Sequence, residues 1–368
     1  MNNKLFYIII SILIIIIIAS IIFFNTANFS PKQAEILENC KTLIYNGEDK
    51  INIVFFSPKE QTKKYSNFLL ATPPFDKNKD AFNFYYIADY SPACELYQGI
   101  AILCYSKELI KKASSCPNDY IVVLEDSPQN LRSSAYMNVM SLNINHPLSV
   151  FAHEFGHAFV NFAEEYVPAK IPSGSKNCVS KCGKFEPITD ECFQGCSEED
   201  YYRSIENGIM RTLLSKEYGK FDENLIQEKI NEQSLKITGF AIDPDDVDCS
   251  QENYYLIEGK YGQEISILER SIEAGCVGEN GAGGFAFNLI LDDNSILTSG
   301  EFNPELIFTD SQNENQEQIQ GEIYNSDITF LLKIPIIENS KTLEIIKDEQ
   351  KISEINLEDM DARPCKIK

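Results

Sequence analysis

The chain has 368 residues, with 32 Lys and Arg against 55 Asp and Glu, so its formal net charge is −23. This charge excludes a typical nucleic-acid-binding protein, because such proteins use Lys and Arg to neutralise phosphates. The hydrophobic fraction of 43% excludes a disordered chain. The length predicts about two domains with their own cores. Only three histidines are present, so their positions are informative.

The N-terminal segment 5–24 reads LFYIIISILIIIIIASIIFF and carries no charge. It is long enough to cross a bilayer core of about 30 Å as a helix, and it exceeds the roughly 7–15 apolar residues of a cleaved signal peptide. We therefore predict a transmembrane signal anchor at residues 5–24 after a cytoplasmic stub at residues 1–4; cleavage after Ala27 is the alternative. Lys4 favours a single-pass protein of the cell membrane, with its C-terminal ectodomain outside the cytoplasm.

The first half of the exported chain alternates predicted strands and helices. Apolar runs such as INIVFF and YIVVLE are typical of buried strands, and the intervening stretches have helical periodicity. This order favours an α+β fold class. The predicted strands cover residues 51–56, 82–88, 120–125 and 134–142, and the predicted helices cover residues 59–70 and 106–114.

Beyond about residue 253 the pattern changes to short strands separated by Gly, Asn and Asp turns. Several short strands at regular spacing predict an antiparallel, Ig-like β-sandwich. The acidic stretch 241–252 reads as a linker with solvated aspartates rather than as a calcium loop. We therefore divide the exported chain into a domain at residues 25–244 and a β-sandwich domain at residues 245–368.

All 11 cysteines follow the predicted anchor. An exported chain with this many cysteines is expected to form disulfides, and the odd number leaves one over, for which we expect Cys365. Cys178, Cys182, Cys192 and Cys196 have paired spacing that suits either a structural zinc or two disulfides, and export favours the disulfides. Nested pairs, 178 with 196 and 182 with 192, would join two antiparallel segments, although spacing alone does not fix the pairing.

Two of the three histidines, His153 and His157, lie in the sequence HEFGH. Residues four apart are neighbours on one helix face, so both imidazoles can face one tetrahedral zinc. Glu154 is then placed to accept a proton from a zinc-bound water. The alternative is a buried helix whose two histidines are hydrogen-bonded in the core. His146, which precedes a proline, reads as a loop or cap residue rather than a ligand.

A catalytic zinc needs a third protein ligand and an open coordination position. No further histidine follows HEFGH, so a carboxylate is implied, and Glu164 and Glu165 come soon after the motif. On a straight helix Glu164 would lie about 10.5 Å beyond His157 along the axis. The chain must therefore bend between Ala158 and Glu165 for either carboxylate to reach the zinc.

The run HEFGHAFVNFAEEY at residues 153–166 resembles the signature of the IgA-peptidase family of zinc metallopeptidases, which reads close to HEFGHSFGxLxDEY. The segment ENGIMR at residues 206–211 is similar to the family's ENSIMR segment, which looks like the Met-turn of the metzincins. INIVFF, ATPPF and FNFYYI also resemble the opening of that family. The similarity covers about residues 45–215.

The resemblance implies a metzincin-like zinc peptidase domain with a methionine beneath the metal. The family's acidic pair falls on Glu164 and Glu165; Glu165 keeps the residue type and is our first choice for the third zinc ligand, with Glu164 second. Val160 stands where the family usually has Gly, and residues 126–134 depart from its glycine-rich loop. By position in the motifs, the resemblance assigns His153 and His157 as zinc ligands. It assigns Glu154 as the general base and Met210 as the turn methionine.

These observations predict a membrane-anchored, extracytoplasmic zinc endopeptidase that acts on protein or peptide substrates and binds no nucleic acid. Zn²⁺ is the expected cofactor, and Glu154 the general base that activates water for attack on the peptide carbonyl. The strand at residues 134–142 is expected to be an edge strand that binds an extended peptide by strand addition. The alternative is a surface-anchored binding or adhesion protein with a vestigial or structural metal site, which the β-sandwich favours.

Overall fold

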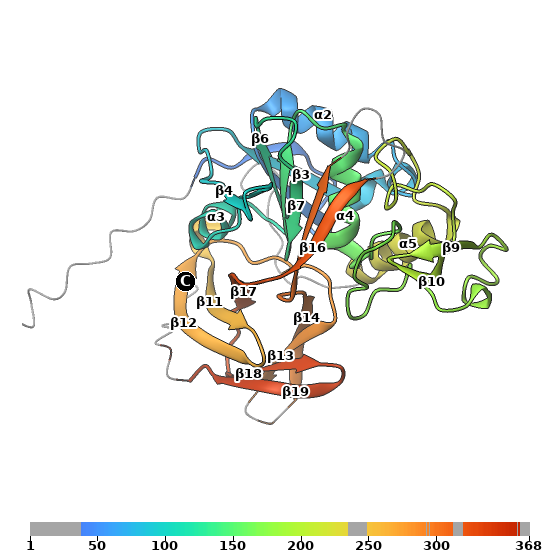
Figure 1. Cartoon of the computed structure of the whole chain (residues 1–368). Helices are drawn as coiled ribbons and strands as arrows, with labels where there is room; N and C mark the ends of the chain where they lie inside the picture. The colour runs from blue at the N-terminus through green and yellow to red at the C-terminus, as the bar shows by residue number, and fades with distance from the viewer. Residues whose placement is uncertain are drawn as a thin grey trace, which may run out of the picture. The chain divides into compact units, whose positions relative to one another are not determined.

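Figure 1 shows the computed structural model of the chain, in which residues 38–234, 249–291, 293, 295–311, 319–358 and 360 are described. These residues belong to one compact unit. They contain nineteen strands and four α-helices. Strands therefore dominate the described part of the chain.

The fold class predicted from the sequence is wrong. The described residues form a strand-rich fold rather than an α+β domain followed by a separate sandwich, and they include no helix that is both long and apolar enough to cross a membrane. The predicted anchor at residues 5–24 and the stub before it lie outside the described residues. The class was misjudged because β15 and β16, which the sequence placed in the C-terminal sandwich, extend the sheet of the first half of the chain.

The largest sheet has eight strands in the order β1-β3-β2-β6-β8-β7-β15-β16. β3, β2, β6 and β8 are parallel neighbours, whereas β1, β7, β15 and β16 pair antiparallel. Its strands are β1 (Lys41–Ile44), β2 (Ile51–Phe56), β3 (Phe82–Ile87), β6 (Tyr120–Glu125), β7 (Ser133–Tyr136), β8 (Val139–Asn143), β15 (Leu306–Ser311) and β16 (Gln320–Asn325).

The central strands of this sheet are buried on both faces, which explains their continuous apolar sequences. In β2, Ile53 and Phe55 belong to one hydrophobic core, and Val54 and Phe56 to another. The first core includes residues of α2 (Lys59–Leu69), α4 (Ser149–Val160) and α5 (Lys220–Ser234), and the second includes α3 (Lys107–Ala113) and part of β11. The helix α4 thus packs on the sheet and contacts α2 and α5 (Figure 1).

Aromatic side chains fill the space between α4 and the sheet. Phe155 stacks on Phe159 with 4.9 Å between ring centroids, and the Tyr120 ring meets Phe155 edge-on at 5.2 Å. Both phenylalanines are fully buried. Each buried side chain of this size stabilises the fold by about 1.5–3 kcal/mol. This packing fixes the position of the helix that carries the histidines.

Two smaller antiparallel sheets follow, with the orders β12-β11-β17 and β14-β13-β18-β19, and they share one core. β15 and β16 lie between β14 and β17 in sequence, yet they leave these sheets and extend the eight-stranded sheet. The strands of the smaller sheets are β11 (Asn253–Tyr261), β12 (Ile265–Ala274), β13 (Phe285–Leu291), β14 (Ile296–Phe302), β17 (Thr329–Pro335), β18 (Ser340–Lys347) and β19 (Gln350–Asn356); two hairpins add β4 (Glu95–Tyr97), β5 (Ala101–Leu103), β9 (Phe193–Cys196) and β10 (Glu198–Arg203).

Every cysteine in the described residues lies in a disulfide. The two nested pairs expected from the sequence are formed, together with three further bonds. Cys365 and the acidic residues 241–248 lie outside the described residues. The five bonds are Cys40–Cys116, Cys94–Cys104, Cys178–Cys196, Cys182–Cys192 and Cys249–Cys276.

Candidate metal centre

The two histidines of HEFGH lie one turn apart on α4 and face the same point. The Nε2 atoms of His153 and His157 are 3.2 Å apart. Each Nδ1 lies within hydrogen-bond distance of a backbone carbonyl, Ile209 at 2.9 Å and Phe162 at 2.7 Å. A carbonyl only accepts, so each Nδ1 carries a proton, and Nε2 is the atom that a neutral ring would offer to a metal. Histidines that bind metals are commonly oriented by such a hydrogen bond from the other ring nitrogen.

The bend that the sequence required is made by Asn161. This residue ends α4 in the left-handed conformation, with φ 54° and ψ 41°, and its N–H donates to the His157 carbonyl. Asn adopts this conformation more readily than most residues. The Asn161 amide also donates to Ser173 and accepts from Asn303. Val160, at the position of the family's glycine, is still helical.

The bend places Glu164, rather than Glu165, beside the histidines. The Glu164 carboxylate oxygens lie 3.0 Å from His157 Nε2 and 3.5 Å from His153 Nε2. Burial opposes its ionisation, but the two imidazoles hold the pKa of Glu164 at about 2. Glu165 is buried elsewhere, next to Asp222, and burial raises its pKa to about 7. The first choice made from the sequence is therefore not the residue that faces the histidines.

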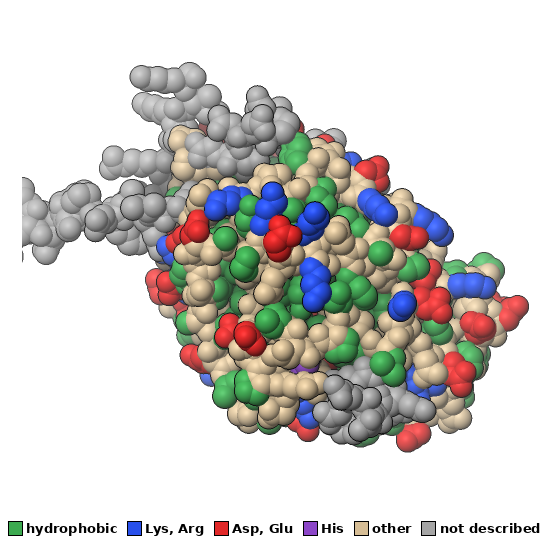
Figure 2. Space-filling view, turned by 90° about the horizontal axis from the view of Figure 1, so that it is seen from above, with side chains coloured by type: hydrophobic (Ala, Val, Ile, Leu, Met, Phe, Trp, Pro, Cys, Tyr) green, Lys and Arg blue, Asp and Glu red, His purple; other side chains and the backbone are tan. Residues whose placement is uncertain are grey.

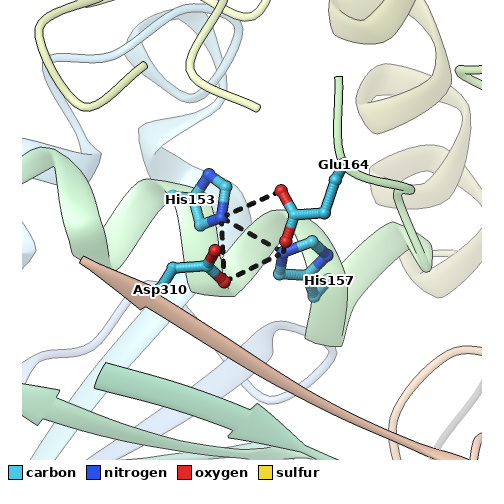
Figure 3. A group of neighbouring side chains, drawn as sticks. All are labelled: His153, His157, Glu164 and Asp310. Atoms are coloured by element: carbon cyan, nitrogen blue, oxygen red, sulfur yellow. Dashed lines mark hydrogen bonds and ion pairs between the residues drawn. The ribbon is translucent and has the colours of Figure 1, made fainter. Parts of the chain in front are cut away.

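Asp310 of β15 joins the same cluster, as Figure 3 shows. Its Oδ2 lies 3.3 Å from His153 Nε2 and 3.9 Å from His157 Nε2. Tyr166 donates a hydrogen bond of 3.1 Å to Asp310 Oδ1. One ligand atom from each of the two histidines, Glu164 and Asp310 lies within 4.8 Å of all the others. The sequence analysis missed Asp310, because no motif surrounds it.

This arrangement fits a bound cation. Both Glu164 oxygens and Asp310 Oδ2 are buried without a hydrogen-bond partner in the described part of the chain, and they face the Nε2 atoms of the two histidines. Although burial opposes it, Glu164 and Asp310 raise the pKa of His153 well above its ordinary value, so a positive charge is favoured here. Buried carboxylates are stable only when paired or when they coordinate a metal. The cluster is therefore a possible metal-binding site.

Two further residues expected at the site lie against it. Glu154 is fully buried, and both its carboxylate oxygens lack a hydrogen-bond partner among the described residues. Met210 is fully buried beneath α4, where a Cβ added at Gly156 would lie 2.7 Å from its sulfur. Gly156 of HEFGH is thus needed for the close approach of Met210 to the helix.

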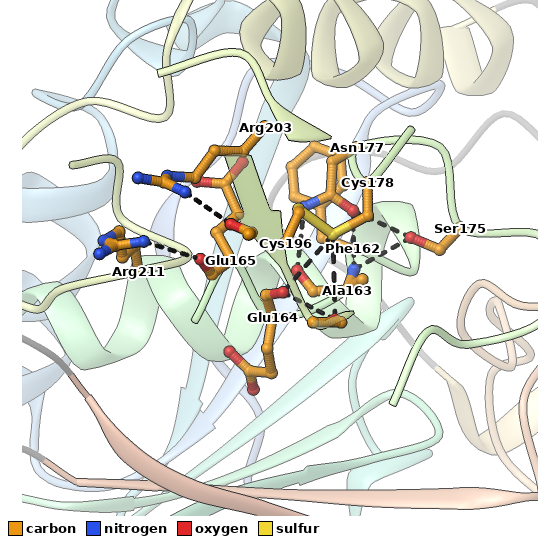
Figure 4. The surroundings of a disulfide bond; sticks show 12 residues. Phe162, Ala163, Glu164, Glu165, Ser175, Asn177, Cys178, Cys196, Arg203 and Arg211 are labelled. Atoms are coloured by element: carbon orange, nitrogen blue, oxygen red, sulfur yellow. Dashed lines mark hydrogen bonds between the residues drawn. A yellow bond between two sulfur atoms is a disulfide. The ribbon is translucent and has the colours of Figure 1, made fainter. Parts of the chain in front are cut away.

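The cysteine-rich segment holds the backbone that presents Glu164 (Figure 4). Cys178 Sγ lies 3.5 Å from the Glu164 carbonyl, to which Ser197 donates at 2.8 Å. The Asn177 side chain accepts from the Ala163 N–H at 2.8 Å and donates to the Ala163 carbonyl at 2.9 Å. The outer disulfide, Cys178–Cys196, is therefore in contact with the ligand segment.

The third histidine takes no part in the cluster. His146 Nδ1 lies 3.0 Å from Ser133 Oγ, and its Nε2 lies 3.1 Å from the Gln129 carbonyl. All three histidines are buried: the exposed fraction is 5% for His146, 0% for His153 and 2% for His157. The face of the molecule shown in Figure 2 accordingly has almost no histidine surface. The four side chains of the candidate metal centre are therefore closed to solvent.

No model of a known protein family matches the chain, and no curated protein matches it either. The function is therefore inferred from the geometry of the site and from the short motifs. The four side chains of His153, His157, Glu164 and Asp310 form a candidate metal centre.

Proposed function

We propose that the chain is a zinc-dependent endopeptidase of an extracytoplasmic, oxidising compartment. The observation that carries the proposal is the convergence of His153, His157 and Glu164, with Glu154 on the same helix turn as the histidines. Two imidazoles and a carboxylate are the ligand set of several zinc peptidases. The five disulfides support the compartment. The resemblance of the HEFGH and ENGIMR segments to the IgA-peptidase family supports the reaction.

Zinc fits this donor set better than the hard cations do, because Mg²⁺ and Ca²⁺ prefer sites made of oxygen atoms alone. When bound, zinc supplies Lewis-acid activation of water and of the substrate carbonyl. The chain's own part in the reaction is proton transfer. Glu154 takes the proton of the attacking water on its carboxylate and gives it to the leaving amine. Its buried position keeps competing solvent away from that proton.

Tyr166 is the tyrosine best placed to take part. Its hydroxyl donates to Asp310, which lies at the histidines, so it can reach an oxygen atom near the metal. The backbone of Tyr202 in β10, by contrast, pairs with Val179. We therefore assign to Tyr166 a hydrogen bond to the carbonyl oxygen of the substrate.

The test compares Glu154→Gln with the natural chain. Both proteins are expected to hold one zinc per chain, measured by mass spectrometry of the metal. Hydrolysis of denatured, fluorescently labelled casein, followed for hours at high protein concentration, is expected to fall by about 10²–10⁴-fold in the variant, because general-base catalysis is lost. Equal hydrolysis by both proteins would refute the role of Glu154.

One observation favours a second candidate, a binding or adhesion protein with a structural metal. Four protein side chains surround the site, and structural zinc sites have four protein ligands and no open position. In that case Asp310→Ala would lose zinc and stability together, and no variant would hydrolyse casein.

A further inference from the structure

Strand β15 lies beside the candidate metal centre, between β7 and the edge strand β16. It pairs antiparallel with β7, with Phe308 opposite Ala135, Thr309 opposite Ser134 and Asp310 opposite Ser133. The segment that the sequence predicted as one edge strand is two strands, β7 and β8, and β7 would be the last strand of the sheet if β15 and β16 were absent. A free edge of this kind accepts an extended polypeptide through main-chain hydrogen bonds.

Alternate residues of β15 cover the metal centre. The Phe308 ring stacks on the His157 imidazole, with 4.0 Å between centroids and 15° between planes. Two residues on, Asp310 Oδ2 lies 3.3 Å from His153 Nε2. Thr309, between them, donates from its side chain to the Glu322 carbonyl of β16. One face of β15 therefore closes the site.

The closed arrangement leaves no room for a substrate. The cavity beside His157 that Phe308 and Ala135 line has a volume of about 10 Å³, enough for about one water molecule. A second cavity, of about 290 Å³, is lined by residues of the 166–170 segment and of β16. β15 is thus packed tightly against the candidate metal centre, whereas β16 borders a larger cavity.

Asp310 differs from the other three ligands in how it is held. His153, His157 and Glu164 come from one short segment, and three protein ligands are what a catalytic zinc site contains. Asp310 comes from the separate hairpin and is kept in place by Tyr166 and by the close approach of Gly321 in β16. Its carboxylate fills the position that a catalytic site leaves open.

We propose that the β15–β16 hairpin is an internal occupant of the substrate cleft. β15 takes the place on β7 of an extended polypeptide substrate, and Asp310 takes the coordination position that the reaction needs. The structure described is then a latent state, which opens when the hairpin leaves β7. The proposal deepens the endopeptidase function and rests on it, since it defines the substrate as an extended chain antiparallel to β7.

The test uses two variants of the full chain that release Asp310 in different ways. Asp310→Asn removes the ligand charge and keeps the side-chain size. Gly321→Ala substitutes none of the four candidate ligands. Its new Cβ would collide with Asp310 Oδ1 and the Tyr166 hydroxyl, so the Asp310 carboxylate must move. Gly300→Ala in β14 is the matched control, because its Cβ would collide with the Phe287 ring of β13, in a different sheet from β15.

Three quantities are measured for each protein, namely zinc content, casein hydrolysis and amide hydrogen exchange of residues 133–136. Asp310→Asn and Gly321→Ala are expected to keep zinc, to exchange faster in β7 and to hydrolyse casein about 10- to 1,000-fold faster. That range corresponds to an open state populated at about 0.1–10% in the natural chain. Gly300→Ala should change neither the exchange of β7 nor the rate.

The outcomes separate this proposal from the proposed function. Loss of zinc in both variants, without faster hydrolysis, overturns latency and makes Asp310 a structural ligand. Hydrolysis that depends on Glu154 but is no faster in either variant also overturns latency, while the endopeptidase function stands. Retained zinc with faster β7 exchange but no hydrolysis by any protein supports the displaceable hairpin and overturns the endopeptidase function.

Discussion

The two sides of the metal centre are built in opposite ways. The α4 side supplies three ligands within residues 153–164, and each ligand is supported by backbone carbonyls, by the Asn161 turn or by the Cys178–Cys196 segment. The β15 side supplies Asp310 alone, from a hairpin whose second strand, β16, borders a cavity. Under the two proposals above, the α4 side is the permanent half, which would hold the metal, and the β15–β16 side is the separable half, which would cover it.

The strongest test of the permanent half compares two adjacent glutamates. Glu164→Gln is expected to lower zinc affinity by more than roughly 100-fold, the upper end of the cost of losing an outer-shell partner. Glu165→Gln should retain zinc, because that carboxylate lies with Asp222 rather than with the histidines. The affinity of each full-length variant is measured by competition with a chelator. Equal loss in both variants would contradict the assignment of Glu164.

The sequence predicted the permanent half of the site but not the separable half. HEFGH encodes its geometry locally, since residues four apart on a helix always meet. The choice between Glu164 and Glu165 depended on where the helix ends, and the only local signal was an asparagine, Asn161, a residue suited to a left-handed cap. Asp310 could not be identified, because its position depends on the pairing of β15 with β7, which no short spacing records.

The fold shows the same division. Strands with strong local patterns, such as INIVFF at residues 51–56 and FAFNLIL at residues 285–291, were predicted at or near their observed bounds. The assignment of these strands to sheets was not predicted, because strand pairing is set by contacts between residues far apart in the sequence. β15 reads LIFTDS and was absorbed into the predicted sandwich, although it belongs to the eight-stranded sheet.

A second prediction compares one buried phenylalanine from each side. Phe155→Ala on α4 is expected to lower the free energy of unfolding by about 3–5 kcal/mol, since it leaves a cavity in the main core. Phe308→Ala on β15 should cost less, because the hairpin can separate without global unfolding. Urea unfolding gives both values, and amide exchange of residues 133–136 should increase only for Phe308→Ala. Equal costs would mean that β15 belongs to the same cooperative unit as α4.

The nested disulfides allow a third comparison within the permanent half. The bonds Cys178–Cys196 and Cys182–Cys192 span 18 and 10 residues, so removing either is expected to cost roughly 3 kcal/mol of stability. Only the outer bond contacts the Glu164 carbonyl. Cys178→Ala/Cys196→Ala should therefore also weaken zinc binding by about 10–100-fold. Cys182→Ala/Cys192→Ala, the matched control, should bind zinc normally; weaker binding there would show that general stability, not contact, controls the site.

The smallest expected effect concerns the turn that delivers Glu164. In Asn161→Ala, the new alanine must adopt the left-handed conformation, which costs about 1–2 kcal/mol. Asn161→Gly loses the same side-chain hydrogen bonds without that conformational cost. The difference in unfolding free energy between these two variants therefore gives the cost of the backbone conformation at residue 161.

Val160→Gly tests the family's glycine position, and it should destabilise the chain by about 0.5–1 kcal/mol because residue 160 is still helical. A stabilised Val160→Gly together with an unaffected Asn161→Ala would move the bend to residue 160. Glu164 would then be brought to the histidines by a different turn from the one described.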